Sequence, residues 1–158
     1  MRALVEMRLP LSMLRLSNAV ETDTNLRLAG HETTIALLEK YLAWRGCRAG
    51  KCLLLLGVSA DATTARHALH TARRLLGRHG AVYIGAAMGS KWAANRFKGP
   101  YLRNTLWDLG YSVDTIETAV DWPQVRPLMQ AMEQAARDAF APFGTPVHAF
   151  SHLSHLYP

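Results

Sequence analysis

Cysteine, long apolar runs and targeting signals are scarce in this sequence, and each scarcity excludes a class of protein. The two cysteines, Cys47 and Cys52, are too few for a disulfide framework, and no Cys-x-x-Cys pair indicates a zinc site. The longest apolar run, Cys52–Leu56, is far shorter than the ~20 residues that cross a bilayer. The first residues also lack the apolar core of a signal peptide. We therefore expect a cytoplasmic protein with reduced thiols, no metal site and no membrane span.

Acidic side chains are missing from a long central stretch. Residues 62–107 contain eight Lys or Arg and no Asp or Glu, within a chain whose formal net charge is +6. Arginine outnumbers lysine, and its planar guanidinium suits carboxylates and phosphates. This distribution favours an anionic partner, either a nucleic acid or a small acidic molecule, although a solvated helix face would have the same composition.

Periodicity predicts an α+β fold in one domain. The 158 residues are 49% hydrophobic, which is enough for a core and excludes disorder as the main state. A strand–helix–strand pattern occurs twice, and two such units are typical of a ferredoxin-like fold with an antiparallel sheet. The expected strands are residues 51–58, 81–84, 112–120 and 147–156, and the expected helices follow Asp61 and Asp121. We also expect a helical N-terminal segment over residues 1–50 and a helical insertion over residues 88–110.

Three histidines, His148, His152 and His155, lie close together near the end of the sequence. On a helix they would share a face and could bind a metal, whereas on a strand His155 points away from the other two. Flanking prolines and alternating apolar residues favour the strand. We therefore expect these histidines to be ordinary polar side chains or to line a site, and not to bind a metal.

Two arginines have distinctive surroundings. Arg103 lies among aromatic residues, where a guanidinium can stack on a ring or bind a carboxylate or phosphate. Arg15 is an isolated charge between two leucines, which fits a surface position or a half-buried pair. The residues alone leave these alternatives open.

Five segments, taken in order, carry a resemblance to one family. They are Pro10–Asn18, Trp92 with Arg96–Phe97, Pro100–Arg103, Asp114–Trp122 and Ser151–Pro158. In order and spacing they resemble the FAD-linked oxidases of the alkyldihydroxyacetonephosphate synthase type, in the vanillyl-alcohol oxidase superfamily. The resemblance extends from about Leu9 to the last residue, and it implies a substrate-binding cap domain that covers the flavin.

The resemblance covers only the cap of such an enzyme. Residues 1–158 are then a single cap-domain fragment, and the family's FAD-binding domain and catalytic tyrosine have no counterpart in the sequence. We expect FAD in the full-length enzyme and none on this fragment, which is inactive alone and contains no catalytic residue. The substrate is expected to be anionic, and both a 2-hydroxy acid and an alkyl or acyl glycerone phosphate stay open.

The resemblance also implies roles for individual residues. Arg103, with Tyr101 beside it, matches the position that binds the acidic or phosphate group of the substrate. Arg15 matches an arginine needed for activity near the flavin. Four further residues match strands that line the active site, and these are Glu117, Thr118, His152 and His155.

Two other functions are alternatives. A nucleic-acid-binding ferredoxin-like module would use the basic stretch, but such modules stack bases on sheet aromatics. The expected strands offer mainly Tyr83, which disfavours nucleic acid as a partner. A stand-alone interaction or dimerisation module is the second alternative, because an apolar sheet face without its docking domain would self-associate into a homodimer.

Overall fold

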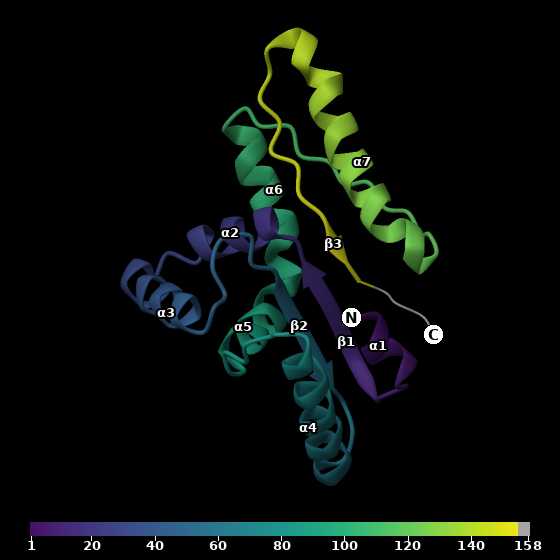
Figure 1. Ribbon diagram of the computed structural model, residues 1–158. Helices are drawn as coiled ribbons and strands as arrows, with labels where there is room; N and C mark the ends of the chain where they lie inside the picture. The colour runs from purple at the N-terminus through teal and green to yellow at the C-terminus, as the bar shows by residue number, and fades with distance from the viewer. Residues whose placement is uncertain (155–158) are drawn as a thin grey trace.

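The structure is a computed structural model that describes residues 1–154, with the side chains of residues 99 and 100 left out. Figure 1 shows a small sheet with α4 beyond one end, α7 beyond the other and α3 at one side. The elements in chain order are α1 (Arg2–Glu6), β1 (Leu11–Ser17), α2 (Ala19–Leu28), α3 (Glu32–Trp44), β2 (Leu53–Val58), α4 (Ala62–Arg78), α5 (Ala87–Asn95), η1 (Arg96–Lys98), α6 (Gly99–Asp108), α7 (Trp122–Phe140), η2 (Ala141–Phe143) and β3 (His152–Leu153).

The sheet is antiparallel, with the strand order β2-β1-β3. Strand β1 pairs with β2 from Leu11 opposite Val58 to Ser17 opposite Leu53. Gly57 suits a close approach in this ladder, because a Cβ built there would lie 3.3 Å from the Cβ of Met13. Strand β3 pairs with the end of β1, so the sheet brings together segments from the two ends of the sequence.

The α+β class and the antiparallel sheet are confirmed, and so is the strand expected at residues 51–58. The helix expected after Asp61 is also confirmed, since α4 begins at Ala62. Asp61 caps it, because its carboxylate accepts hydrogen bonds from the backbone N–H groups of Thr63 and Thr64 at 2.9 and 3.1 Å. A side-chain cap of this kind satisfies donors that have no partner within the helix. The helix expected after Asp121 begins at Trp122.

The helical prediction for residues 1–50 is wrong at Leu11–Ser17, which forms the central strand β1. Periodicity alone does not separate a short apolar strand from a helical segment. Pairing with Leu53–Val58, which lies far along the sequence, decides in favour of the strand. The flanking helices α1, α2 and α3 agree with the prediction.

Two expected strands do not form. Residues 81–84 and 112–120 have no regular secondary structure, and within residues 147–154 the strand covers only His152–Leu153. The β-branched residues of these segments favour extended chain, but a strand also needs a paired neighbour. The ferredoxin-like arrangement therefore stays a prediction.

The core of the described chain is small. Its buried apolar residues are Leu4, Leu26, Leu42, Leu55, Ala68 and Ala72. The accessible surface is 11838 Å², whereas a compact chain of 17.5 kDa exposes about 7,900 Å². Helices α5 and α7 bury none of their described residues. Many large apolar side chains of the described chain are thus exposed.

Neither a membrane-spanning helix nor a disulfide occurs in the part of the chain that the structure describes. No helix there combines the length and the apolar character needed to cross a bilayer. Cys47 and Cys52 are both free thiols.

Candidate functional site

Arg15, Glu21 and His152 meet where β1, α2 and β3 come together, and we call these three residues the Arg15 cluster. The Arg15 guanidinium donates through Nη2 to Oε1 of Glu21. The same Nη2 lies 3.1 Å from Nδ1 of His152. Nδ1 of His152 is in turn 3.4 Å from Oε1 of Glu21. One carboxylate oxygen therefore faces both basic side chains.

The sequence between β1 and α2 brings Glu21 back to Arg15. Asn18 is the N-cap of α2, and its side-chain oxygen accepts a hydrogen bond from the backbone N–H of Glu21 at 2.8 Å. The strand therefore turns directly into the helix, and the first helical turn lies beside the end of the strand. Register in the sheet adds the third residue, because His152 pairs with Ser17.

Glu21 is the charged residue buried most deeply among those described, with 4% of its surface exposed. Burial alone would raise the pKa of the Glu21 carboxyl. Hydrogen bonds from His152 and Ser17, together with the positive charge of Arg15, outweigh burial and hold this pKa below its ordinary value. Glu21 is therefore ionised at neutral pH and balances the charge of Arg15.

A second carboxylate, that of Glu133 on α7, forms hydrogen bonds at the same end of the sheet. Its Oε1 accepts from the side-chain amide of Asn18 at 2.8 Å and from the hydroxyl of Ser151. Farther along α2, Oγ1 of Thr24 lies 2.8 Å from Nε2 of His148. His148 and His152 thus contact α2 at two separate places, and within residues 1–154 no group of side chains is arranged to hold a metal ion.

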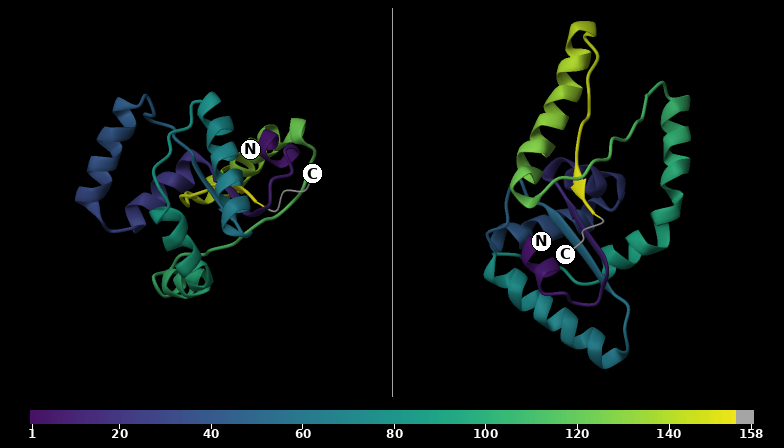
Figure 2. Two further views of the ribbon diagram at one scale, coloured as in Figure 1. Left: turned by 90° about the horizontal axis from the view of Figure 1, so that it is seen from below. Right: turned by 90° about the vertical axis from the view of Figure 1, so that its right-hand side faces the viewer.

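Arg103 and Tyr101 lie elsewhere, on α6. Both side chains are exposed, and the Arg103 guanidinium lies 5.0 Å from the ring centroid of Trp107. Both views of Figure 2 place α6 apart from β3. The structure therefore does not bring Arg103 beside Arg15.

The other predicted site residues are scattered. Glu117 and Thr118 are exposed in a segment that has no regular secondary structure, instead of lying on a strand. His155 lies outside the described residues. Of the predicted set, the structure brings together Arg15 and His152.

Two contributors to the site, Glu21 and Glu133, were absent from the predicted set. The spacing Asn18-x-x-Glu21 is a capping-box signal, and it could have located both the start of α2 and the carboxylate at its third position. No local signal points to Glu133, because its partners are 115 and 18 residues away.

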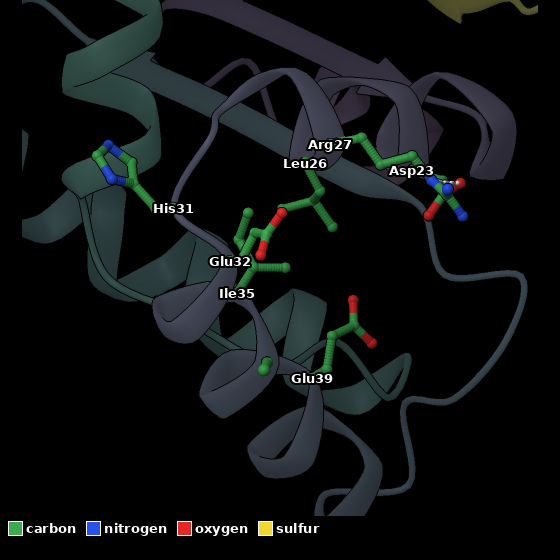
Figure 3. Close-up of a pocket in the computed structure, with 8 residues that line it drawn as sticks. Asp23, Leu26, Arg27, His31, Glu32, Ile35 and Glu39 are labelled. Atoms are coloured by element: carbon green, nitrogen blue, oxygen red, sulfur yellow. Dashed lines mark hydrogen bonds and ion pairs between the residues drawn. The ribbon is translucent and has the colours of Figure 1, made fainter.

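A separate hollow of about 380 Å³ lies between α2 and α3. Figure 3 shows its lining, in which Asp23 forms an ion pair with Arg27 at 2.8 Å. The complete lining is Asp23, Leu26, Arg27, His31, Glu32, Ile35, Ala36 and Glu39. Of its three carboxylates, that of Asp23 pairs with Arg27 and that of Glu39 pairs with Lys51, both at 2.8 Å. One negative charge is left in excess, which disfavours a phosphate or a carboxylate.

Comparisons with known proteins identify the family. The whole chain, residues 1–158, matches the family described as FAD linked oxidases, C-terminal domain. The chain belongs to this family. This FAD-linked oxidase domain is also similar to the alkyldihydroxyacetonephosphate synthase of Dictyostelium discoideum, with 28% identity over 153 residues. The match covers 92% of this chain and 25% of that protein, so the domain spans about a quarter of the length of its relative.

These matches confirm the resemblance inferred from the five segments. No solved structure matches the chain.

An enzyme of the FAD-linked oxidase family contains FAD, so the described residues can be tested for a fit to it. The pyrophosphate of FAD needs positive charge or free helix N–H groups. The hollow between α2 and α3 has an excess of carboxylates. The lining of this hollow therefore does not fit the pyrophosphate of FAD.

Proposed function

We propose that residues 1–158 form the substrate-binding cap of an FAD-linked oxidase and lie against an FAD-binding domain. The observation that carries this proposal is the family match over the whole chain. An accessible surface of 11838 Å², about half as large again as that of a compact chain, supports it. In such an enzyme the flavin supplies the redox chemistry, while the cap positions the substrate and excludes water.

Arg15 is the residue to which we assign the anionic group of the substrate. Its side chain is 21% exposed, so a ligand can reach it, while Glu21 and His152 hold the guanidinium in place. Nη2 of Arg15 is engaged by Glu21 and His152, so the N–H groups of Nη1 and Nε are the ones left to donate charge-assisted hydrogen bonds to a carboxylate or a phosphate. A 2-hydroxy acid and an alkyl or acyl glycerone phosphate both carry such a group.

Arg103 and Tyr101 are assigned a separate contact with substrate or partner, because α6 lies apart from β3. Glu117, Thr118 and His155 keep the predicted role of lining the active site of the whole enzyme. On this proposal the isolated chain holds no flavin, has no oxidase activity and belongs to a cytoplasmic enzyme.

Visible absorption of the purified chain, after incubation with FAD and desalting, tests the domain assignment. We expect a colourless protein that binds the dye ANS, because the apolar surface meant for the FAD-binding domain is open. A yellow protein would overturn the assignment. A colourless chain that binds no ANS and forms a tight dimer in sedimentation would replace the proposal by the stand-alone dimerisation module.

A further inference from the structure

Glu21 is a buried acid that the proposed function uses only to hold the Arg15 guanidinium in place. Only 4% of its surface is exposed, and its Oε2 has no hydrogen-bond partner among the described residues. Its other oxygen, Oε1, faces both Arg15 and His152. Burying a carboxylate costs free energy unless its charge is paired and hydrogen-bonded, and here Oε1 alone makes these contacts.

At the start of α2, the Glu21 carboxylate does not make the hydrogen bond that a capping box would give it. In a capping box, the third helical residue returns its side chain to the N–H of the N-cap residue. Asn18 and Glu21 form the first half of that box, through the 2.8 Å hydrogen bond from the Glu21 N–H to the Asn18 side chain. The second half is missing, because the Asn18 N–H donates to the carbonyl of Ser151 at 3.0 Å. The Glu21 carboxylate is thereby left to the Arg15 cluster.

His152 has two incompatible hydrogen-bond roles in this cluster. Arginine only donates, so Nδ1 of His152 must be unprotonated to accept from Arg15 at 3.1 Å. Glu21 is ionised and only accepts, so Nδ1 must carry a proton to donate to its Oε1 at 3.4 Å. A proton on Nδ1, which the imidazolium always carries, therefore favours the contact with Glu21 over the contact with Arg15.

The charge of the cluster follows from these roles. With His152 neutral, Arg15 and Glu21 cancel, and the cluster has no net charge. With His152 protonated, the cluster has one positive charge, and Glu21 is engaged by the imidazolium. Among residues 1–154, Glu133 from α7 also brings a charge to this end of the sheet, where its Oε1 accepts hydrogen bonds from Asn18 and Ser151.

We propose that Glu21 is the specificity-determining residue of the Arg15 site: it cancels the charge of Arg15, so that the site attracts an anion when His152 is protonated and not when His152 is neutral. This inference rests on the proposed function in one respect, namely that Arg15 is the anion contact. It adds that the contact with an anion depends on the charge of Glu21 and on the protonation of His152.

Sulfate is a suitable probe because it keeps both of its charges between about pH 5.5 and about pH 8, the range in which histidine titrates. Binding is followed by NMR through the backbone amides of Asn18 and Ser151, so that weak binding elsewhere on the basic chain does not contribute. We expect sulfate to bind wild-type protein about tenfold more tightly at the lower pH, as the cluster gains one charge at close range.

The Glu21→Gln variant keeps the size of the side chain and removes its charge. It should bind sulfate about tenfold more tightly than wild type at the higher pH, while Glu21→Asp, which keeps the charge, stays near wild type. His152→Gln should make the affinity independent of pH. Glu32→Gln is the matched control, since it makes the same change at an exposed glutamate of α3 outside the Arg15 cluster, and it should leave the pH profile unchanged.

The outcomes separate this inference from the function on which it rests. Equal affinities of Glu21→Gln and wild type at the higher pH, or a flat wild-type profile, would overturn the role of Glu21 while leaving Arg15 as the anion contact. Unchanged sulfate binding in Arg15→Met would instead remove Arg15 from the proposed site. If Glu21→Gln does not fold, the affinity of His152→Gln decides, because His152 is more exposed than Glu21. This variant should bind sulfate at both pH values as weakly as wild type does at the higher pH, and tighter binding would mean that Glu21 does not cancel the charge of Arg15.

Discussion

Arg15 and Arg103 lie in two regions of the chain that are held together by different kinds of contact. The Arg15 cluster joins residues that are 137 positions apart, through hydrogen bonds around a buried carboxylate. Arg103 belongs to an arm, residues 87–111, whose polar and ring contacts join near neighbours such as Trp107. The cluster thus depends on the tertiary fold, whereas these polar and ring contacts of the arm are formed within its own helices.

Exposure follows the same division. The strands and α2 provide the buried residues around Arg15, while the arm presents large apolar side chains to solvent. Those side chains are Phe97, Tyr101, Leu102, Trp107, Leu109 and Tyr111. The sheet end is thus buried around Arg15, whereas the arm exposes apolar surface. Variants in matched pairs, one member in each region, test this division.

Leucine-to-alanine substitutions should show the largest contrast. Leu55 is buried in β2 opposite Arg15, so Leu55→Ala should lower the free energy of unfolding by about 2–4 kcal/mol. Leu102 in the arm is 45% exposed, and Leu102→Ala should change it by no more than about 0.5 kcal/mol. Urea denaturation measures both. Equal losses would mean that the arm is packed as tightly as the sheet.

Asparagine-to-alanine substitutions give the next contrast. Asn18 caps α2 and also donates to Glu133, so Asn18→Ala removes two contacts and should cost about 1–2 kcal/mol. Asn104, exposed in the middle of α6, has no such task, and Asn104→Ala should be neutral or slightly stabilising because alanine favours helix. Thermal unfolding followed by circular dichroism compares the pair, and a large loss at Asn104 would contradict the division.

The two regions also differ in how far they could be predicted. Helices with a clear local signal, such as α4 after its Asp61 cap, follow from short-range pattern and were predicted. Strand β1 was mistaken for helix because its apolar run is short and its partner, Leu53–Val58, lies far along the chain. Likewise, segments 81–84 and 112–120 have strand-like composition, but no neighbour pairs with them.

The candidate site shows the same limit. Arg15 and His152 were singled out from the sequence, but their proximity is created by the β1–β3 register, which no local pattern specifies. Glu21 could have been found from the capping-box spacing, although its carboxylate does not complete the box. Only the tertiary fold shows that this carboxylate faces Arg15 instead.

Acid should lower the stabilisation that the Arg15 cluster contributes, and this is the smallest of the three effects. The pKa of Glu21 is lower in the folded protein than its ordinary value of 4.5, so the unfolded chain binds the proton more readily. The stabilisation by Glu21 is therefore fully present above that value and is lost as the pH falls through the lower, folded-state pKa. Asp61 acts in the same direction, because hydrogen bonds from Thr64 and Thr63 lower its pKa.

Comparison of wild type with Glu21→Gln, by urea denaturation at neutral and acidic pH, isolates the contribution of Glu21 from that of Asp61. The variant should be less stable than wild type at neutral pH, and the difference should shrink as the pH falls below 4.5, the ordinary pKa of the carboxyl, because protonation removes the same charge that the substitution removes. A difference that stays constant with pH would mean that Glu21 stabilises the sheet end by its shape and not by its charge.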